Sequence, residues 1–253
     1  MKLSVVVITK NEEENIRECL ESVKFADEIV IVDDFSIDNT VSICREYTDK
    51  IYTRELDGFA KQKQFGVDRA KGEWILVLDA DERLTPELQK EILATLSRDS
   101  DYAGFKILRK SFYLGSWIRH CDWYVAILRL FRKDKGWFDS RLVHENIHVS
   151  ATIGTLRHPM LHYSYNSIAQ HVEKINIYSS FEARELFKIG IRLNPINFAW
   201  LLFLKPILIF IRKYFFMLGI LDGRNGFLIS AFTATVLFLT YVKLWELQIR
   251  NGK

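Results

Sequence analysis

The chain has 253 residues, a formal net charge of +3, 49% hydrophobic residues and 26% charged residues. This length accommodates one sizeable α/β domain with an additional segment, and so small a net charge gives no indication of a nucleic-acid partner. The charge is unevenly distributed, because the part from Arg184 onward has ten Lys or Arg against three Asp or Glu and is also the most apolar. Basic residues among Trp, Phe, Leu and Ile indicate an anionic membrane surface.

The first hundred residues alternate between short apolar runs and amphipathic segments. We expect strands at residues 3–9, 28–32, 50–53 and 74–79, and helices at 11–23, 38–47, 59–70 and 87–96. Strands that alternate with helices of this length predict a doubly wound, mostly parallel sheet. The run at 3–9 is too short for a signal peptide and leads directly into charged residues, so the catalytic part is expected in the cytoplasm.

The three cysteines fit that compartment. Cys19, Cys44 and Cys121 are odd in number and lack the spacing of metal ligands. Cys19 and Cys44 fall in predicted helices and are most simply buried thiols in a reducing compartment.

The second half of the chain has a different pattern. Strands are expected at 104–109, 126–132 and 147–149, separated by aromatic-rich loops, and a long helix at 167–189. The following apolar stretch, 196–221, is interrupted by Lys205-Pro206 and Arg212-Lys213, whose spacing places the cations on one helical face. This favours a helix that lies in the membrane interface.

The last apolar stretch, 227–242, has no charge but is shorter than the roughly 20 residues of a membrane span. We expect a packed hydrophobic helix pair that dips into one leaflet. A transmembrane span and an oligomerisation surface remain open as alternatives.

Acidic residues follow two of the predicted strands. Asp79, Asp81 and Glu82 come at the end of the apolar run 74–78, and Asp33-Asp34 end the run 28–32. The carboxyl ends of parallel strands share one edge of the sheet, where ligands of such sheets bind. Carboxylates gathered there repel one another unless a cation lies between them, which predicts Mg²⁺ or Mn²⁺. The alternative is that these acids only cap the next helix, although Thr85-Pro86-Glu87 already provides such a start.

Three segments in this order resemble glycosyltransferase family 2 with the GT-A fold. They are residues 4–12 (SVVVITKNE), 31–40 (IVDDFSIDNT) and 78–82 (LDADE). Val143-His144-Glu145 and the hydrophobic tail with Leu221-Asp222-Gly223 are similar to the branch that includes lipopolysaccharide core β-glucosyltransferases. The resemblance covers essentially the whole chain.

The resemblance implies a nucleotide-diphospho-sugar donor. Asp81 of the DXD motif would bind a metal on the diphosphate, whereas Asp79 would contact the ribose or organise the loop. Asp33 or Asp34 would accept hydrogen bonds from uracil or ribose, and Lys63 would reach the donor phosphates. The donor-binding candidates are therefore Thr9, Asn11, Glu12, Asp33, Asp34, Lys63 and Asp79. Gln64 departs from the family pattern of Gln-Lys-Asn, which leaves a contact from this side chain in doubt.

Inverting transfer also needs a general base on the acceptor hydroxyl. Glu145 in the His-Glu motif is the expected catalytic residue, and Asp122 is the second candidate. His162 would bind the metal or the diphosphate, or is a structural histidine. Arg129 and Arg132 either contact the donor phosphates or pair with acids.

These expectations together describe an inverting, metal-dependent glycosyltransferase with UDP-glucose as the first donor to consider. Its acceptor would be a membrane-anchored glycan, such as lipopolysaccharide core or a polyprenyl-linked sugar, at the cytoplasmic face of the inner membrane. The enzyme would be peripheral or shallowly inserted, and a homo-oligomer is possible. Residues 1–195 would form the GT-A domain, with a nucleotide-sugar half at 1–100 and an acceptor half at 101–195, and 196–253 would form the membrane-associating segment.

Three other functions stay open. A nucleotidyltransferase would want a glycine-rich phosphate loop after the first strand, and residues 9–12 contain no glycine. A non-catalytic protein of the same fold would hold a nucleotide sugar or glycan, although Asp81 and Glu145 together argue against it. A membrane scaffold would leave the paired acidic clusters unexplained.

Overall fold

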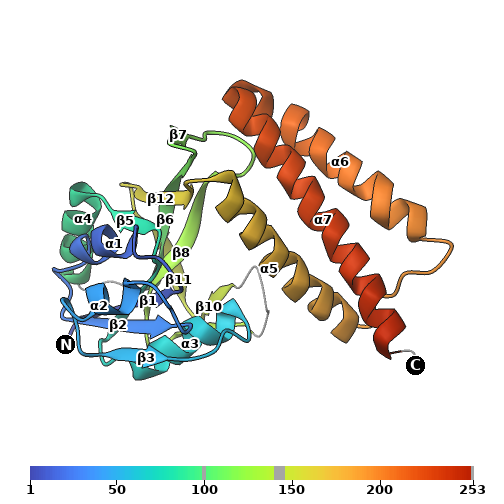
Figure 1. Cartoon of the computed structure of the whole chain (residues 1–253). Coiled ribbons are helices and arrows are strands. Elements are labelled where there is room, and N and C mark those ends of the chain that lie inside the picture. The colour runs from blue at the N-terminus through green and yellow to red at the C-terminus, as the bar shows by residue number, and fades with distance from the viewer. Residues whose placement is uncertain (99–100, 140–145, 252–253) are drawn as a thin grey trace. The chain divides into compact units, whose positions relative to one another are not determined.

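The computed structural model describes residues 1–98, 101–139 and 146–251. The chain forms two compact units, one made of residues 1–110 and 125–163 and the other of residues 111–124 and 164–253. Figure 1 shows the elements of both units. Residue 195, where the sequence predicts the start of the membrane-associating segment, lies in the second unit, and the functional division of the chain stays a prediction.

The first unit is built on a mixed sheet whose parallel part comes first in the chain. The parallel strands are arranged in the order β3-β2-β1-β4. They are β1 (Leu3–Thr9), β2 (Glu28–Asp33), β3 (Ile51–Thr53) and β4 (Trp74–Asp79). The sheet confirms the mostly parallel α/β arrangement expected from the alternating pattern, and it agrees with the GT-A fold that the family resemblance implies.

The sheet continues beyond β4 with strands from the second half of the sequence. The order after β4 is β8-β6-β12-β5, and β8 runs antiparallel to β4. These strands are β5 (Glu82–Leu84), β6 (Tyr102–Tyr113), β8 (Tyr124–Arg132) and β12 (Met160–Tyr165). Shorter strands are β7 (Ser116–Trp117) and β11 (Thr152–Thr155), which pair with β6, and β9 (Gly136–Phe138) and β10 (Ile147–Val149), which pair with each other.

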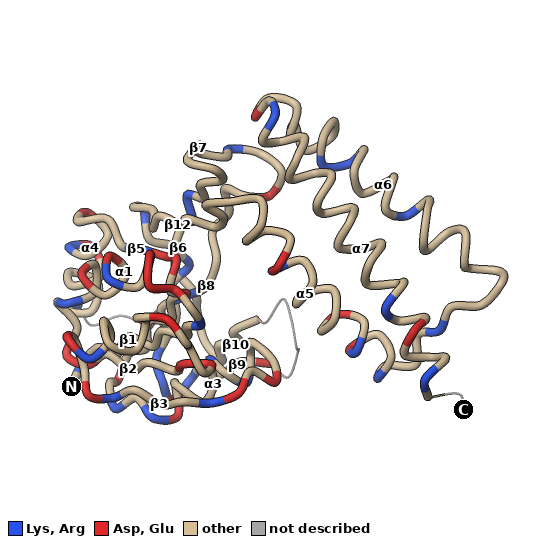
Figure 2. Tube along the Cα trace, viewed as in Figure 1, with Lys and Arg blue, Asp and Glu red and all other residues tan. Residues whose placement is uncertain are grey.

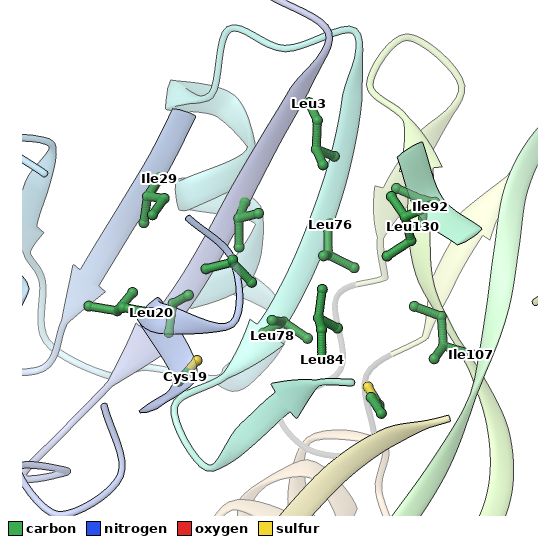
Figure 3. Packing of buried hydrophobic residues seen from close by; sticks show 14 of the residues in the cluster. Leu3, Cys19, Leu20, Ile29, Leu76, Leu78, Leu84, Ile92, Ile107 and Leu130 are labelled. Atoms are coloured by element: carbon green, nitrogen blue, oxygen red, sulfur yellow. The ribbon is translucent and has the colours of Figure 1, made fainter. Parts of the chain in front are cut away.

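Helices cover both faces of the parallel strands, because successive side chains of a strand point to opposite faces. Val5 and Val7 of β1 belong to a core that includes residues of α1 (Ile16–Glu21), α2 (Thr40–Cys44) and α4 (Pro86–Leu96). Figure 3 shows this packing. Val6 belongs to the opposite core, with α3 (Phe59–Arg69). The continuous apolar strands of the sequence are thus strands buried on both faces.

Close packing of α3 on the sheet explains one glycine. A Cβ at Gly66 would lie 2.4 Å from Cγ1 of Val6, so only glycine fits at this contact. The helix therefore approaches β1 closely, which fixes the position of Lys63 one turn earlier in α3.

The structure differs from the expectations in two places in the first unit. The first helix begins at Ile16 and not at residue 11, because Asn11 has a left-handed backbone (φ 50°) and the chain turns between Glu12 and Asn15. The pair β5–β12 was missed, since β5 has only three residues and β12 mixes apolar with polar side chains.

The second unit consists mainly of three long helical segments. They are α5 (Ile168–Lys188), the run formed by η1 (Trp200–Leu204), α6 (Lys205–Ile211) and η2 (Arg212–Phe216), and α7 (Gly223–Asn251), which η3 (Gly219–Asp222) precedes. The helix α7 packs against both α5 and α6, as Figure 1 shows. The expected hydrophobic helix pair is therefore present, but it is joined to α5 in one core.

Polar contacts fix α7 against α5. The Nζ atom of Lys243 donates to oxygen atoms of Asn176, Ser179 and Ser180, and Thr240 Oγ1 donates to Oε2 of Glu182 at 2.9 Å. Among the described residues, one helix, at 219–251, is long and apolar enough to cross a membrane by length and composition, with a mean hydropathy of 1.8.

Candidate functional site

The polar residues singled out in the sequence gather at the carboxyl ends of three neighbouring strands. In the sheet, β1 lies between β2 and β4, with Thr9 in register with Asp33 and Ile8 in register with Asp79. The two acidic clusters therefore lie at one edge of the sheet, on either side of the end of β1. This is the position at which ligands of open α/β sheets bind.

The loops after β1 and β2 are tied together by hydrogen bonds. Asn11 N donates to Ser36 Oγ at 2.8 Å, and Ile37 N donates to Asn11 Oδ1 at 2.9 Å. Asp33 accepts from Ser36 N at 3.0 Å and from Ser36 Oγ at 2.5 Å. Both Asn11 and Phe35 have positive φ angles, which is the kind of backbone strain that clusters at ligand sites. Asp33 and Asn11 thus shape this double loop.

Asp34 and Glu12 also make contacts inside these loops. Asp34 Oδ2 lies 2.7 Å from Lys10 Nζ, and Asp34 Oδ1 accepts from Leu56 N at 3.1 Å. Glu12 accepts from Asn15 Nδ2 at 2.7 Å, while its amide donates to Thr40 Oγ1. The direct contacts of these acids with a nucleotide remain predictions.

Thr9 offers a hydroxyl at the end of β1 that a ligand could engage. The residue is 6% exposed, and its Oγ1 has no hydrogen-bond partner among the residues that the structure describes. Buried hydroxyls are normally satisfied, since leaving one unpaired costs about 1–3 kcal/mol. An unpaired hydroxyl between two acidic strand ends fits a site that is completed by a bound molecule.

Two of the three carboxylates after β4 are neutralised by protein cations. Asp79 Oδ1 lies 2.8 Å from Lys63 Nζ, and Asp79 Oδ2 lies 2.8 Å from a guanidinium nitrogen of Arg129. The same Arg129 nitrogen lies 2.7 Å from Oε1 of Glu82, which is fully buried. Burial alone would raise the pKa of Asp79, but Lys63 and Arg129 together hold it well below its usual range.

This arrangement changes how the acidic run is interpreted. The sequence predicted a metal ion between mutually repelling carboxylates, whereas for Asp79 and Glu82 the compensating cations are Lys63 and Arg129. Glu82 also accepts from Asp79 N at 3.0 Å and so closes the turn. Lys63 and Asp79, both expected at the donor, lie against each other, and any direct donor contact from them remains a prediction.

The third carboxylate, Asp81, lies beside His162. The strand β12 pairs with β5, which places His162 opposite Glu82, and Tyr163 N donates to the carbonyl oxygen of Asp81 at 2.9 Å. His162 Nε2 is 3.6 Å from Asp81 Oδ1. Asp81 and His162 are 81 positions apart in the sequence, but the fold places the carboxylate and the imidazole side by side.

The pair formed by Asp81 and His162 suits a divalent metal ion that is shared with a substrate. Carboxylate and imidazole are both common metal ligands, and Mg²⁺ in particular binds through one or two carboxylates plus substrate phosphates. In the part of the chain that the structure describes, no group of three His, Cys, Asp or Glu residues is placed to hold a metal alone. If Asp81 and His162 are its ligands among the described residues, a metal bound here would take further ligands from a substrate, from water or from outside those residues.

The remaining site candidates are only partly described. Glu145, the expected base, lies outside the described residues. Asp122 belongs to the second unit, has a left-handed backbone (φ 63°) and is 57% exposed, with Oδ2 at 3.8 Å from Lys213 Nζ. Arg132 pairs with Glu73, and Gln64 Oε1 accepts from Phe138 N at 2.9 Å. Both side chains are therefore engaged away from Asp79, Asp81 and Glu82.

Sequence reasoning missed the roles of Glu82 and Arg129. Glu82 was counted among the metal-attracting acids, although it faces inward to Arg129 and Arg109. No signal in the sequence indicated this role, because the strand Glu82–Leu84 has only three residues and only one of them, Leu84, is apolar. For Arg129 the sequence left two contacts open, with the donor phosphates or with acids. In the structure its guanidinium pairs with Asp79 and Glu82.

Comparisons with known proteins agree on the family. The model of "Glycosyl transferase family 2" matches residues 4–156. An uncharacterized glycosyltransferase of Rickettsia typhi is 33% identical, with 99% of this chain and 89% of that protein covered. The lipopolysaccharide core biosynthesis glycosyltransferase LpsC of Rhizobium meliloti is 31% identical, with 97% and 93% covered.

A solved structure shares the fold. The mannosyltransferase PcManGT of Pyrobaculum calidifontis, determined in complex with GDP-Man and Mn²⁺, has a TM-score of 0.56 and 15% identity. The match covers 97% of this chain and 87% of that one. From the motifs at the strand ends, the family match and the full-length relatives, we conclude that this chain is a glycosyltransferase that belongs to glycosyl transferase family 2.

Proposed function

We propose that the protein transfers a hexose, with inversion, from a nucleoside diphosphate donor to a membrane-anchored glycan of the lipopolysaccharide core type. UDP-glucose is the first donor to test. The observation that carries the proposal is the pair Asp81–His162, in which Asp81 follows β4 at the sheet edge where β1 and β2 also end. Mg²⁺ or Mn²⁺ is the proposed cofactor.

The proposed chemistry divides between holding the donor and activating the acceptor. Asp81 and His162 would hold the metal ion, which when bound would offset the charge that develops on the leaving nucleoside diphosphate. Thr9 and the loops shaped by Asn11 and Asp33 would hold the nucleoside. Lys63 and Arg129 keep the Asp79–Glu82 turn in place, so that Asp81 is presented to the diphosphate and not to its neighbours.

Glu145 is the proposed general base. It would take the proton of the acceptor hydroxyl on the side of the sugar opposite the leaving diphosphate, which is what inversion requires. Asp122 remains the second candidate for this role, since its side chain is exposed on a loop of the second unit.

The proposed acceptor follows from the relatives and the tail. LpsC is described as a lipopolysaccharide core biosynthesis glycosyltransferase, and the C-terminal part of this chain combines apolar helices with an excess of basic residues. A glycan embedded in a membrane requires an enzyme that works at the interface. The proposed place of action is therefore the cytoplasmic face of the inner membrane.

The experiment supplies purified protein with Mn²⁺ and a panel of nucleotide sugars, with and without a lipid extract, and measures released nucleoside diphosphate. Release from one donor that is stimulated by lipid is the expected result and identifies the sugar. Release that lipid does not stimulate contradicts the membrane-anchored acceptor.

Two variants separate metal binding from base catalysis. Asp81→Ala should abolish transfer and weaken donor binding in the presence of Mn²⁺, whereas Glu145→Gln should abolish transfer and keep donor binding. Near-normal turnover by Glu145→Gln would show that the base is assigned wrongly, and Asp122→Asn would be the next variant.

Calorimetry with Mn²⁺ and UDP tests the metal site without turnover. Because the described part of the chain places one carboxylate and one imidazole together, we expect UDP to raise the affinity for Mn²⁺ by about tenfold or more. Asp81→Asn should remove this increase, while Asp134→Asn, which changes an exposed loop acid, should keep it. Equal Mn²⁺ affinity with and without UDP contradicts a shared site.

The second candidate function is a non-catalytic protein of the same fold that binds a nucleotide sugar or glycan. Tight donor binding without release from any donor would favour it.

A further inference from the structure

The second unit has an apolar surface along one face of the η1–α6–η2 helix. Between residues 200 and 208 exposed large apolar side chains are separated by no more than three positions and follow one helical face, and Phe215 lies about two turns further along. They are Trp200, Phe203, Leu204, Ile207, Leu208 and Phe215. We call these six residues the outer stripe; it extends over roughly 20 Å at 1.5 Å per residue.

The cations of this helix do not lie within the outer stripe. Lys205 Nζ donates to the hydroxyl of Tyr241 on α7 at 2.6 Å, and Lys213 Nζ donates to the carbonyl oxygen of Cys121 at 3.0 Å. Leu202 and Pro206 are buried beside them. The sequence placed Lys205, Arg212 and Lys213 on one helical face, and in the structure Lys205 and Lys213 are turned toward the protein. Figure 2 shows how few ionisable residues α6 and α7 have along most of their length.

Basic residues lie instead at both ends of the stripe. Near the turn between η2 and α7, Arg119, Arg212 and Arg224 are exposed, and the Arg119 guanidinium lies over the Trp117 ring, 4.3 Å from its centroid. Near the other end, Lys188 and Arg192 are exposed. An apolar face bordered by cations is complementary to acyl chains bordered by anionic headgroups.

The same charges argue against a second copy of the chain on this surface. In a two-fold symmetric dimer that uses the outer stripe, each end of one stripe lies against an end of the stripe of the other copy. Either orientation would place basic residues against basic residues, which is unfavourable.

A bilayer-spanning α7 is also disfavoured by its contacts. The helix α5 lies along α7, with His171 against Phe232 and Glu182 on Thr240. If α7 crossed the membrane in this arrangement, α5 would bring Glu173, Lys174 and Glu182 into the hydrocarbon, at a cost of several kcal/mol. The second unit is therefore suited to lying on a membrane and not to crossing it.

We propose that the outer stripe is the membrane-docking surface of the protein. Its side chains insert among the acyl chains of an anionic bilayer, and Arg119, Arg212 and Arg224 contact headgroup phosphates. This proposal deepens the proposed function, on which it rests for the membrane-anchored acceptor.

The test measures binding of the full chain to phosphatidylcholine vesicles with and without phosphatidylglycerol, by co-sedimentation. The variant Ile207→Gln/Leu208→Gln removes two stripe residues that are 54% and 49% exposed. Because burial of each such side chain corresponds to about tenfold in affinity, binding should fall by up to roughly a hundredfold. The matched control is Leu93→Gln/Val172→Gln, at helix residues 46% and 50% exposed outside the stripe, and it should bind like the wild type.

A second variant tests the arginines. Arg119→Gln/Arg212→Gln/Arg224→Gln should lose about fivefold per residue on phosphatidylglycerol vesicles, while binding to phosphatidylcholine alone changes little. Unchanged melting temperature and UDP binding in each variant establish that the fold and the donor site are intact. A protein that binds vesicles through the stripe but transfers no sugar would contradict the proposed function and leave the docking surface standing.

Three outcomes overturn the docking proposal. Equal vesicle binding by the stripe variant and the wild type would place the contact elsewhere. A dimer in sedimentation velocity that the stripe substitutions dissociate, with no vesicle binding, would assign the stripe to a second copy. Retention of the chain in cell membranes after an alkaline carbonate wash would indicate a spanning helix.

Discussion

Lys63 supplies one of the positive charges that compensate Asp79 in the turn formed by residues 79–82. Its side chain is 2% exposed and pairs with Asp79, which in turn shares Arg129 with Glu82. Without Lys63, Asp79 retains Arg129, which it shares with Glu82, and the loss of one charged hydrogen-bond partner costs about 2 kcal/mol. We expect Lys63→Met to lower the free energy of unfolding by that amount in urea titrations, and Lys63→Met/Asp79→Asn to recover part of it. Equal stability of the two variants would mean that the pair is not coupled.

The same pair predicts a dependence on pH. Because the folded-state pKa of Asp79 is depressed, its stabilising contribution is fully present above the unfolded-state pKa of about 4 and is lost as the pH falls below that value. The acid-induced loss of stability below pH 4 should therefore be smaller in Lys63→Met than in the wild type.

His171 makes a pH-dependent contribution in the second unit. Its ring stacks on Tyr165 with centroids 3.9 Å apart, and its Nδ1 lies 3.1 Å from the Tyr113 hydroxyl. Burial, with a smaller effect of Lys174, lowers the pKa of His171 to about 4. The unfolded state has a pKa of about 6.5, so it binds more protons between these values and stability falls by about 3 kcal/mol as the pH drops from 6.5 to 4.

Denaturation at pH 5 and pH 7 tests this contribution. The difference between the two pH values should shrink in His171→Phe and persist in His158→Gln, which changes an exposed histidine. A pH difference that is the same in wild type and His171→Phe would assign the effect to other groups.

At the scale of elements, Asp222 connects two segments that are a hundred residues apart. Its side chain is 6% exposed, accepts from the backbone amides of Arg119 and His120, and lies 3.1 Å from His120 Nδ1. Around it Cys121, Asp122 and Leu218 all have left-handed backbones. The Leu-Asp-Gly motif noted in the sequence thus holds the turn before α7 against the loop 119–122.

Amide hydrogen exchange can measure this connection. Asp222→Ala should cost about 2 kcal/mol, as expected for hydrogen bonds to a charged group, and should speed exchange at the amides of Arg119 and His120. Asp122→Asn, which removes the charge of an exposed acid in the same loop and is compatible with its left-handed backbone, should leave this protection unchanged. Protection that survives Asp222→Ala would show that other contacts hold the loop.

At the scale of the whole molecule, the tail is part of a folding unit. Ala183 and Leu193 belong to one core with Leu202, Tyr241 and Leu244. A fragment of residues 1–195 would expose the apolar face of α5, so we expect it to bind a hydrophobic dye and to aggregate, unlike the full chain. A monomeric fragment that unfolds cooperatively at the melting temperature of the full chain would contradict this expectation.

The local patterns of the sequence were sufficient for the elements of the parallel sheet. The runs at 3–9 and 74–78 are almost entirely apolar, as expected for strands buried on both faces, and β1 (Leu3–Thr9) and β4 (Trp74–Asp79) form there. The acids that follow were placed at one edge, because parallel strands end on the same side. The family resemblance rested on these same segments.

What the sequence could not supply were contacts between distant segments. The pairing of β5 with β12 brings His162 to Asp81, Arg129 of β8 neutralises Asp79 and Glu82, and Lys205 and Lys213 turn toward the protein. Period and propensity describe neighbours along the chain, whereas partner choice for a charge depends on which segments pack together. The sequence by itself determined the α/β class, the family and the acidic edge, and only the tertiary structure decided which cations and side chains those acids meet.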